Sequence, residues 1–276
     1  MTIAAAAGIA VLATISSAGE PKLSPDELVV RHLAAIGSAE DRAAASPRLV
    51  EGTCTFEVRR GGAGALAGRT RIASEGRRYG IDLRFGQSNY WGESVAYDGR
   101  KVDVGFMQAM RRSALGDFLN TYDALVREGL LGGVLSTAWP LQDLAGRSPK
   151  LKYEGLENLL GRPLHRLAYR AAKGQADVLV DLYFEPETFR HVRTVYALRR
   201  RPGMSGAIED SAGQLDTSYR IEETFANFAS AGRLTLPKRW TLTFSLEGPA
   251  RSSLMIWETV VEGVSTPLPT SPAPGP

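Results

Sequence analysis

The feature that most restricts the fold of this chain is a two-residue alternation of apolar and polar side chains that returns many times along it. Over residues 50–58, Val50, Cys54 and Phe56 fall on one side, and the residues between them are mostly polar. A period of two predicts a strand with one face buried and the other in water. The same pattern recurs at residues 79–85, 95–97, 102–104, 178–184, 192–198, 219–225, 234–246 and 254–261.

The connections between most of these segments are short. Asp98-Gly99, for example, joins two of them as a turn-forming pair. Parallel neighbours need crossover connections of a dozen or more residues, so the predicted strands are expected to pair antiparallel.

A helix is predicted ahead of the first strand. Ser24 is a suitable N-cap, Pro25 suits the first helical position, and Glu27 is placed to complete a capping box. This helix is expected to continue to Ile36 and to end at Gly37.

The alternation is interrupted once, by residues 112–144, which we call the insertion. Apolar residues from Leu115 to Val126 recur at three- and four-residue spacing, which predicts a helix that ends near Gly129. The rest of the insertion is apolar but contains glycine and proline, a composition that suits a mobile cover as well as core packing. The pattern therefore predicts one large antiparallel sheet with a helix before it and a helical insertion in its middle, or else a closed barrel with a helical plug. A curved sheet under such a cover would enclose a concave apolar space, the usual setting for a lipid or acyl ligand.

The composition offers few groups for chemistry. The chain has 33 Lys and Arg against 30 Asp and Glu, and the two signs alternate along it, which argues against a nucleic-acid partner. The single cysteine, Cys54, excludes an intramolecular disulfide and a cysteine zinc cluster, and three histidines leave little for a metal site. His165 and His191 are the candidates for a catalytic base, but both fall on predicted strands. They are interpreted as surface or sheet-packing residues, with a hydrolase as the least favoured alternative.

The two ends of the chain are interpreted as lying outside the folded domain. Residues 3–15 form an apolar run, and Ser16 and Ala18 supply the small residues that a signal peptidase needs for cleavage after Ala18. The run is shorter than the ~20 apolar residues of a membrane-spanning helix. Residues 1–18 are therefore predicted to be a secretory signal, with a retained anchor as the alternative. The proline-rich residues 266–276 are predicted to be a disordered tail.

Several short motifs follow one another in a distinctive order. The first is an N-terminal helix at residues 26–33 with the strand after it at 50–58. Two later pairs of strand and turn segments follow, at residues 161–167 with 181–188 and at 225–228 with 234–237. In this order they resemble the LolA-like family, the periplasmic outer-membrane lipoprotein-sorting proteins and their relatives, over most of residues 24–262. The resemblance implies a single α+β domain whose antiparallel sheet forms an unclosed half-barrel capped by helices. It also implies an apolar interior that receives acyl chains, with no enzyme activity and no cofactor.

The leading hypothesis is a periplasmic carrier that binds lipid or lipoprotein acyl chains in an apolar cavity. Its partners would be lipid or acylated lipoprotein, and envelope membrane proteins. The alternative is a sensory or scaffolding domain of the same fold that binds lipoprotein or a protein partner. The residues predicted to line the cavity come from the insertion and the strands: Phe85, Leu119, Leu130, Leu131, Trp139, Phe184 and Phe244. The sequence leaves open which face of the sheet lines it.

Overall fold

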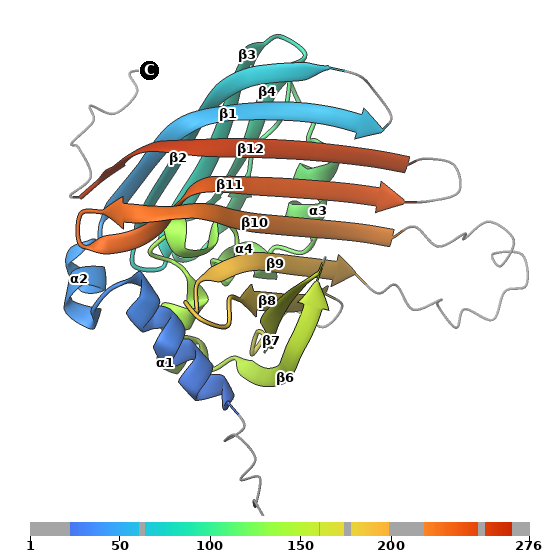
Figure 1. Ribbon diagram of the computed structural model, residues 1–276. Helices are drawn as coiled ribbons and strands as arrows, with labels where there is room; N and C mark the ends of the chain where they lie inside the picture. The colour runs from blue at the N-terminus through green and yellow to red at the C-terminus, as the bar shows by residue number, and fades with distance from the viewer. Residues whose placement is uncertain are drawn as a thin grey trace, which may run out of the picture.

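A single curved antiparallel sheet dominates the computed structural model (Figure 1). The structure describes residues 23–60, 64–159, 161–173, 178–198, 218–247 and 252–266. The predicted signal at residues 1–18 and all but the first residue of the predicted tail at 266–276 lie outside these described residues.

The sheet has twelve strands in the order β5-β4-β3-β2-β1-β12-β11-β10-β9-β8-β7-β6. Their bounds are β1 Arg48–Arg60, β2 Ala65–Glu75, β3 Arg78–Gln87, β4 Tyr90–Tyr97, β5 Val102–Val104, β6 Lys150–Leu159, β7 Arg162–Arg170, β8 Val178–Phe184, β9 His191–Leu198, β10 Ser218–Ala231, β11 Leu234–Glu247 and β12 Ser252–Ser265. Every neighbouring pair is antiparallel, as the short connections predicted. Because β5 and β6 form the two edges, the sheet is an unclosed half-barrel and not a closed barrel.

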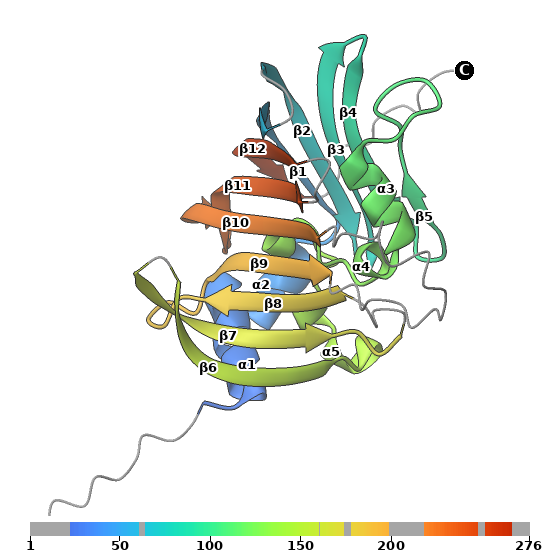
Figure 2. The same cartoon turned by 90° about the vertical axis from the view of Figure 1, so that its right-hand side faces the viewer.

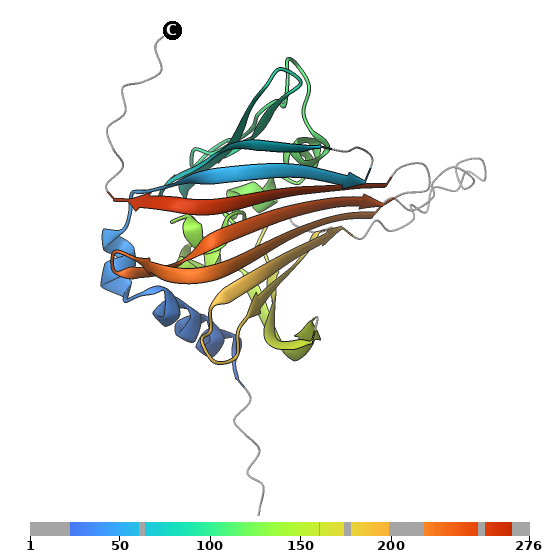
Figure 3. The same cartoon turned by 45° about the horizontal axis from the view of Figure 1, so that its top comes forward.

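The insertion connects the two edges of this half-barrel. The chain leaves the sheet at β5, crosses its concave side and re-enters at β6. Figure 2 shows α3, α4 and α5 inside the curve of the sheet, and Figure 3 shows β1, β12, β11 and β10 running side by side. The helical segments are α1 Pro25–Ile36, α2 Ala39–Ala44, α3 Ala114–Thr121, α4 Ala124–Arg127, η1 Gly133–Leu135, η2 Pro140–Gln142 and α5 Leu144–Arg147.

The first helix, α1, forms where the sequence predicted it. The Ser24 hydroxyl accepts a hydrogen bond from the Glu27 N–H at 3.1 Å, and Gly37 closes the last turn by donating to the Leu33 carbonyl at 3.3 Å. The Glu27 carboxylate pairs with Arg31 one turn further along the helix.

The single helix predicted in the insertion is instead two helices, α3 and α4. The break falls at Tyr122, whose φ of −107° and ψ of 49° leave the helical region. A straight amphipathic helix would keep one side in water, but Ala124, Leu125 and Val126 are all buried. The break therefore turns the second segment into the interior, and Gly129, with φ 69°, ends it as predicted.

The core lies between the insertion and the concave face of the sheet. Trp139 of the insertion and Trp240 and Trp257 of the sheet are at most 1% exposed. Along β11 the buried Trp240, Leu242 and Phe244 alternate with more exposed residues, which confirms the two-residue period. Within the described residues, no helix combines the length and apolar character needed to span a membrane.

Candidate functional site

The seven residues predicted to line a cavity are all buried in the core between the sheet and the insertion. Phe244 packs against Phe118 of α3, with 6.1 Å between ring centroids. Leu119 and Leu131 border a small internal cavity of about 20 Å³. The ring centroid of Phe85 lies 5.9 Å from that of Phe56, and Phe56 lines a larger cavity. The other predicted residues, Leu130, Trp139 and Phe184, pack inside the core and border neither of these cavities.

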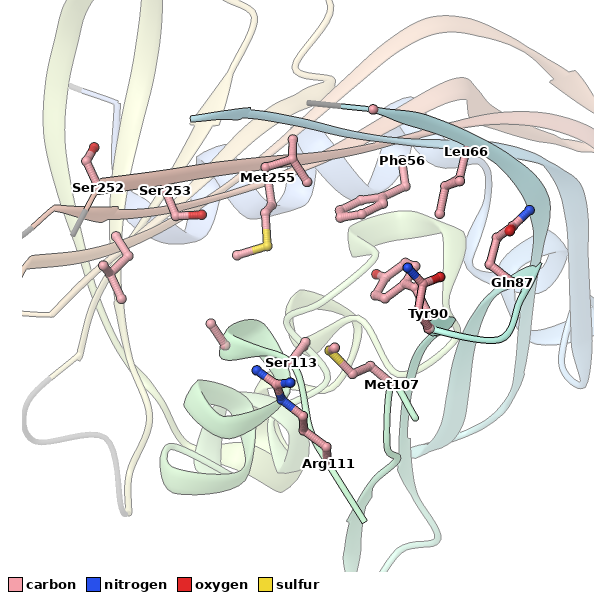
Figure 4. Close-up of a pocket in the computed structure, with 15 residues that line it drawn as sticks. Phe56, Leu66, Gln87, Tyr90, Met107, Arg111, Ser113, Ser252, Ser253 and Met255 are labelled. Atoms are coloured by element: carbon pink, nitrogen blue, oxygen red, sulfur yellow. The ribbon is translucent and has the colours of Figure 1, made fainter. Parts of the chain in front are cut away.

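The larger cavity lies at the end of the sheet remote from α1 and α2, and we call it the end cavity (Figure 4). Its volume is about 740 Å³. The apolar side chains in its wall are Phe56, Val58, Leu66, Met107, Ala114, Leu246 and Met255. The polar ones are Gln87, Asn89, Tyr90, Ser113, Ser252 and Ser253, with Arg111 as the charged member. Phe56, Leu66 and Met255 project from the sheet, and Met107, Arg111 and Ser113 face them from the segment that precedes α3 (Figure 4).

An aromatic cluster joins the end cavity to the core. Phe56 stacks on Tyr90 at 4.5 Å and on Trp257 at 5.1 Å between ring centroids. Phe85 packs behind Tyr90 at 5.4 Å. Since these rings come from β1, β3, β4 and β12, four strands together fix this part of the cavity wall.

Two hydroxyl groups of the cavity wall bind the carboxylate of Glu93, which lies behind them. Tyr90 donates to one oxygen at 2.8 Å and Ser113 to the other at 2.7 Å. Burial raises the pKa of Glu93 to about 7. Ser113 also caps α3 by accepting from the Gly116 N–H at 2.8 Å, so this network ties the cavity wall to the start of the insertion.

Buried polar side chains hold the insertion on the concave face. Arg48 donates to the Val134 carbonyl at 2.9 Å, and Tyr79 donates to the Val126 carbonyl at 3.0 Å. Arg48 is the first residue of β1 and Tyr79 the second residue of β3. The insertion is therefore docked by directional contacts in addition to apolar packing.

Glu223 of β10 makes the most extensive of these contacts. One of its oxygens accepts from the Gly132 N–H at 2.7 Å and from the Trp240 indole at 2.8 Å, and the other accepts from the Tyr196 hydroxyl at 2.6 Å. The residue is fully buried, and burial raises its pKa to about 7. The sequence interpretation missed this role, although an acidic residue in phase with Ile221 on the apolar side of a strand was a signal for it.

A second polar cluster docks the far part of the insertion on α1. The Trp139 indole donates to Nε2 of His32 at 3.0 Å, and Nδ1 of His32 lies 3.0 Å from the Phe189 carbonyl. This arrangement requires neutral His32 with its proton on Nδ1. Desolvation by burial lowers the pKa of His32 to about 4 and that of His191, which stacks on Trp139 at 4.6 Å, well below its usual value.

The two histidines considered as catalytic bases sit in packed surroundings. Nε2 of His191 lies 2.9 Å from the Thr194 hydroxyl, and both residues are fully buried. His165 lies 2.8 Å from the Tyr153 hydroxyl and stacks on Phe189. In the part of the chain that the structure describes, no three His, Cys, Asp or Glu side chains are grouped so as to hold a metal ion.

No family model matches the chain, and no curated protein sequence matches it. Several solved structures are similar to it. A putative outer membrane lipoprotein-sorting protein domain from Vibrio parahaemolyticus is 11% identical with a TM-score of 0.48, covering 88% of this chain and 95% of that one. A LolA superfamily protein from Nitrosomonas europaea is 12% identical with a TM-score of 0.46, covering 88% and 93%. A DUF1329 family protein from Desulfovibrio piger is 12% identical with a TM-score of 0.43, covering 90% and 93%.

Proposed function

We propose that the protein is a periplasmic carrier that binds an acyl chain of a lipid or lipoprotein in the end cavity and catalyses no reaction. The observation that carries this proposal is the end cavity itself, which has a volume of about 740 Å³ and a wall with seven apolar side chains, five of them from the sheet. Ligand pockets of ~300 to 1,000 Å³ with apolar walls and a few polar groups are typical sites for small molecules. The predicted signal at residues 1–18 supports the periplasmic location.

The energetics of such a site suit a reversible carrier. Each methylene group removed from water contributes about 0.8 kcal/mol, so a chain that buries roughly eight of them gains about 6 kcal/mol. Part of this gain offsets the entropy lost on binding. The net affinity is therefore expected to be modest, which allows the chain to be released.

The insertion would enlarge the site when it moves. In the structure its apolar residues, among them Leu130 and Leu131, occupy the concave interior. Its first residues, Ser113 and Ala114, line the end cavity. The contacts that hold it there include the single carboxylate of Glu223 and the ring of His32. We expect cargo larger than one acyl chain to require displacement of the insertion from this face.

The proposal is tested by binding of palmitate to the purified chain and to two matched variants. Met255 and Val260 lie on the same strand, β12, but Met255 lines the end cavity and Val260 is 42% exposed elsewhere. Met255→Asp places a carboxylate in the apolar wall and is expected to lower the affinity for palmitate at least about tenfold. Val260→Asp is expected to leave it unchanged. Absence of palmitate binding to the wild type, or equal loss in both folded variants, would contradict the proposal.

A further inference from the structure

The charge on the wall of the end cavity has one sign. Among the residues that the structure describes, fifteen line the cavity, and of these Arg111 is the charged one and none is Asp or Glu. The remaining polar groups are hydroxyl groups and two side-chain amides, Gln87 and Asn89. A wall of this composition attracts a ligand that is apolar over most of its length and negatively charged at one end.

The backbone around Arg111 fixes its place at the cavity. The Arg111 N–H donates to the Gln108 carbonyl at 3.1 Å, and the Arg111 carbonyl accepts from the Met107 N–H at 2.9 Å. This tight turn brings Met107 and Arg111 onto the same wall, across from Phe56 and Met255 (Figure 4). Arg111 is exposed to water, whereas Phe56 is buried. Arg111 therefore lies on the solvent-facing side of the cavity, which we call its wet side, and Phe56 lies on the side that faces the core.

The guanidinium of Arg111 is available to a ligand. Among the ion pairs between described residues, none involves Arg111. The acidic residue behind the wall, Glu93, accepts hydrogen bonds from Tyr90 and Ser113. By contrast, neighbouring Arg112 donates to the Val104 carbonyl and lies over the Phe106 ring.

We infer that Arg111 selects ligands with an anionic head group, a carboxylate or a phosphate, at the end of a single acyl or alkyl chain. The chain lies against Phe56 and Met255, and the head group stays at the wet side, where the planar guanidinium donates two parallel hydrogen bonds to its oxygens. This inference rests on the proposed function, because it names the class of ligand that the end cavity takes.

The test compares three ligands with the same chain length and different head groups: dodecanoate, dodecyl phosphate and the uncharged dodecanol. Each is titrated against the full chain preloaded with N-phenylnaphthylamine, an uncharged fluorophore that emits in apolar surroundings, and displacement of the fluorophore gives the affinity. Arg111→Gln removes the charge, and Arg111→Lys keeps the charge without the planar guanidinium that donates two parallel hydrogen bonds. Arg100→Gln removes a charge from the exposed turn between β4 and β5. Circular dichroism confirms that each variant is folded.

Wild type is expected to bind at least one of the two anions about tenfold more tightly than dodecanol. Arg111→Gln should abolish this preference without changing the affinity for dodecanol, Arg111→Lys should retain part of it, and Arg100→Gln should retain all of it. The anion bound more tightly identifies the head group as carboxylate or phosphate. Two results would overturn the inference and leave the proposed function standing. One is equal binding of all three ligands to the wild type. The other is an unchanged preference for the anions in Arg111→Gln, whether or not Arg111→Lys also retains that preference. Failure of all three ligands and of the fluorophore to bind would instead overturn the proposed function.

Discussion

The carboxylate of Glu223 accepts a hydrogen bond from the backbone N–H of Gly132, 2.7 Å away, and this contact joins the insertion to the centre of the sheet. The two residues are 91 positions apart in the sequence. Since the same carboxylate also binds Trp240 and Tyr196, one side chain organises the interior of the half-barrel.

Removing this carboxylate should destabilise the protein strongly. Glu223→Ala leaves three buried donors without an acceptor, so we expect the free energy of unfolding to fall by about 3 kcal/mol or more. Glu223→Gln should cost less stability. The glutamine carbonyl can accept from the Gly132 N–H and the Trp240 indole, and its amide can donate to the Tyr196 hydroxyl. Glu222→Ala, which breaks ion pairs of a partly buried carboxylate with Arg193 and Arg220, should cost less than Glu223→Ala, because Glu222 does not bind the insertion. Urea denaturation measures all three, and an equal loss in Glu222→Ala and Glu223→Ala would refute this role.

The insertion also depends on a glycine that has no room for a side chain. Gly133 has φ 49°, and a Cβ there would lie 2.8 Å from the Phe225 ring and 3.2 Å from the His191 ring. Gly133→Ala should therefore loosen the insertion and speed its cleavage by protease. Gly76 has a similar φ of 56° with nothing within 4 Å, so Gly76→Ala carries only the backbone strain of ~1 kcal/mol. Similar proteolysis rates for the two variants would show that steric fit at Gly133 is unimportant.

The period-two pattern and the turn residues predicted much of this architecture. Most of the strands, α1 and the interrupting insertion were found from local patterns, because sheets and helices bury one face at a fixed period. The edge strand β6 was not predicted. The pairing of β1 with β12 and the buried contacts of Arg48 join residues far apart in the sequence, and no local pattern encodes them. For the same reason the end cavity escaped prediction. Its wall combines the ends of six strands with the segment before α3 and the first residue of that helix. Most of its residues, such as Ser252 and Met107, are unremarkable in the sequence.

Acid should weaken the docking of the insertion on α1. The pKa of His32 is about 4 in the folded protein, below the ordinary histidine value of 6.5, so the unfolded chain binds the proton more tightly. Stability from neutral His32 is therefore complete above pH 6.5 and is lost as the pH falls toward 4, by about 3 kcal/mol. His191 shifts in the same direction.

His32→Gln isolates this contribution, since glutamine keeps one donor and one acceptor but does not titrate. The free energy of unfolding, measured by urea denaturation from pH 7 to pH 4, should fall less steeply in His32→Gln than in the wild type. Glu223 acts in the opposite direction, because its raised pKa of about 7 favours the folded state at low pH and loses this effect between pH 4.5 and 7. Identical pH profiles for wild type and His32→Gln would exclude His32 as the source.

The wall of the end cavity should depend on the hydroxyl of Tyr90. This hydroxyl accepts from the Trp257 indole at 2.7 Å and donates to Glu93, so Tyr90→Phe leaves the indole N–H without an acceptor. We expect a loss of about 1 to 3 kcal/mol in the free energy of unfolding, with the apolar ring surface retained. Tyr97→Phe removes a hydroxyl that donates to the Gly99 carbonyl at the surface and should change stability by less than ~0.5 kcal/mol. Thermal unfolding of the two variants distinguishes these expectations, and equal melting temperatures would contradict them.

The methionine side chains can report directly whether the end cavity holds an apolar chain. Met107 and Met255 line the cavity from opposite walls, whereas Met110 is 89% exposed and lies outside the lining. In a protein labelled with carbon-13 on its methionine methyl groups, NMR during titration with palmitate should show the signals of Met107 and Met255 shifting together to saturation while Met110 changes least. Saturable palmitate binding that leaves the Met107 and Met255 signals in place would contradict the account.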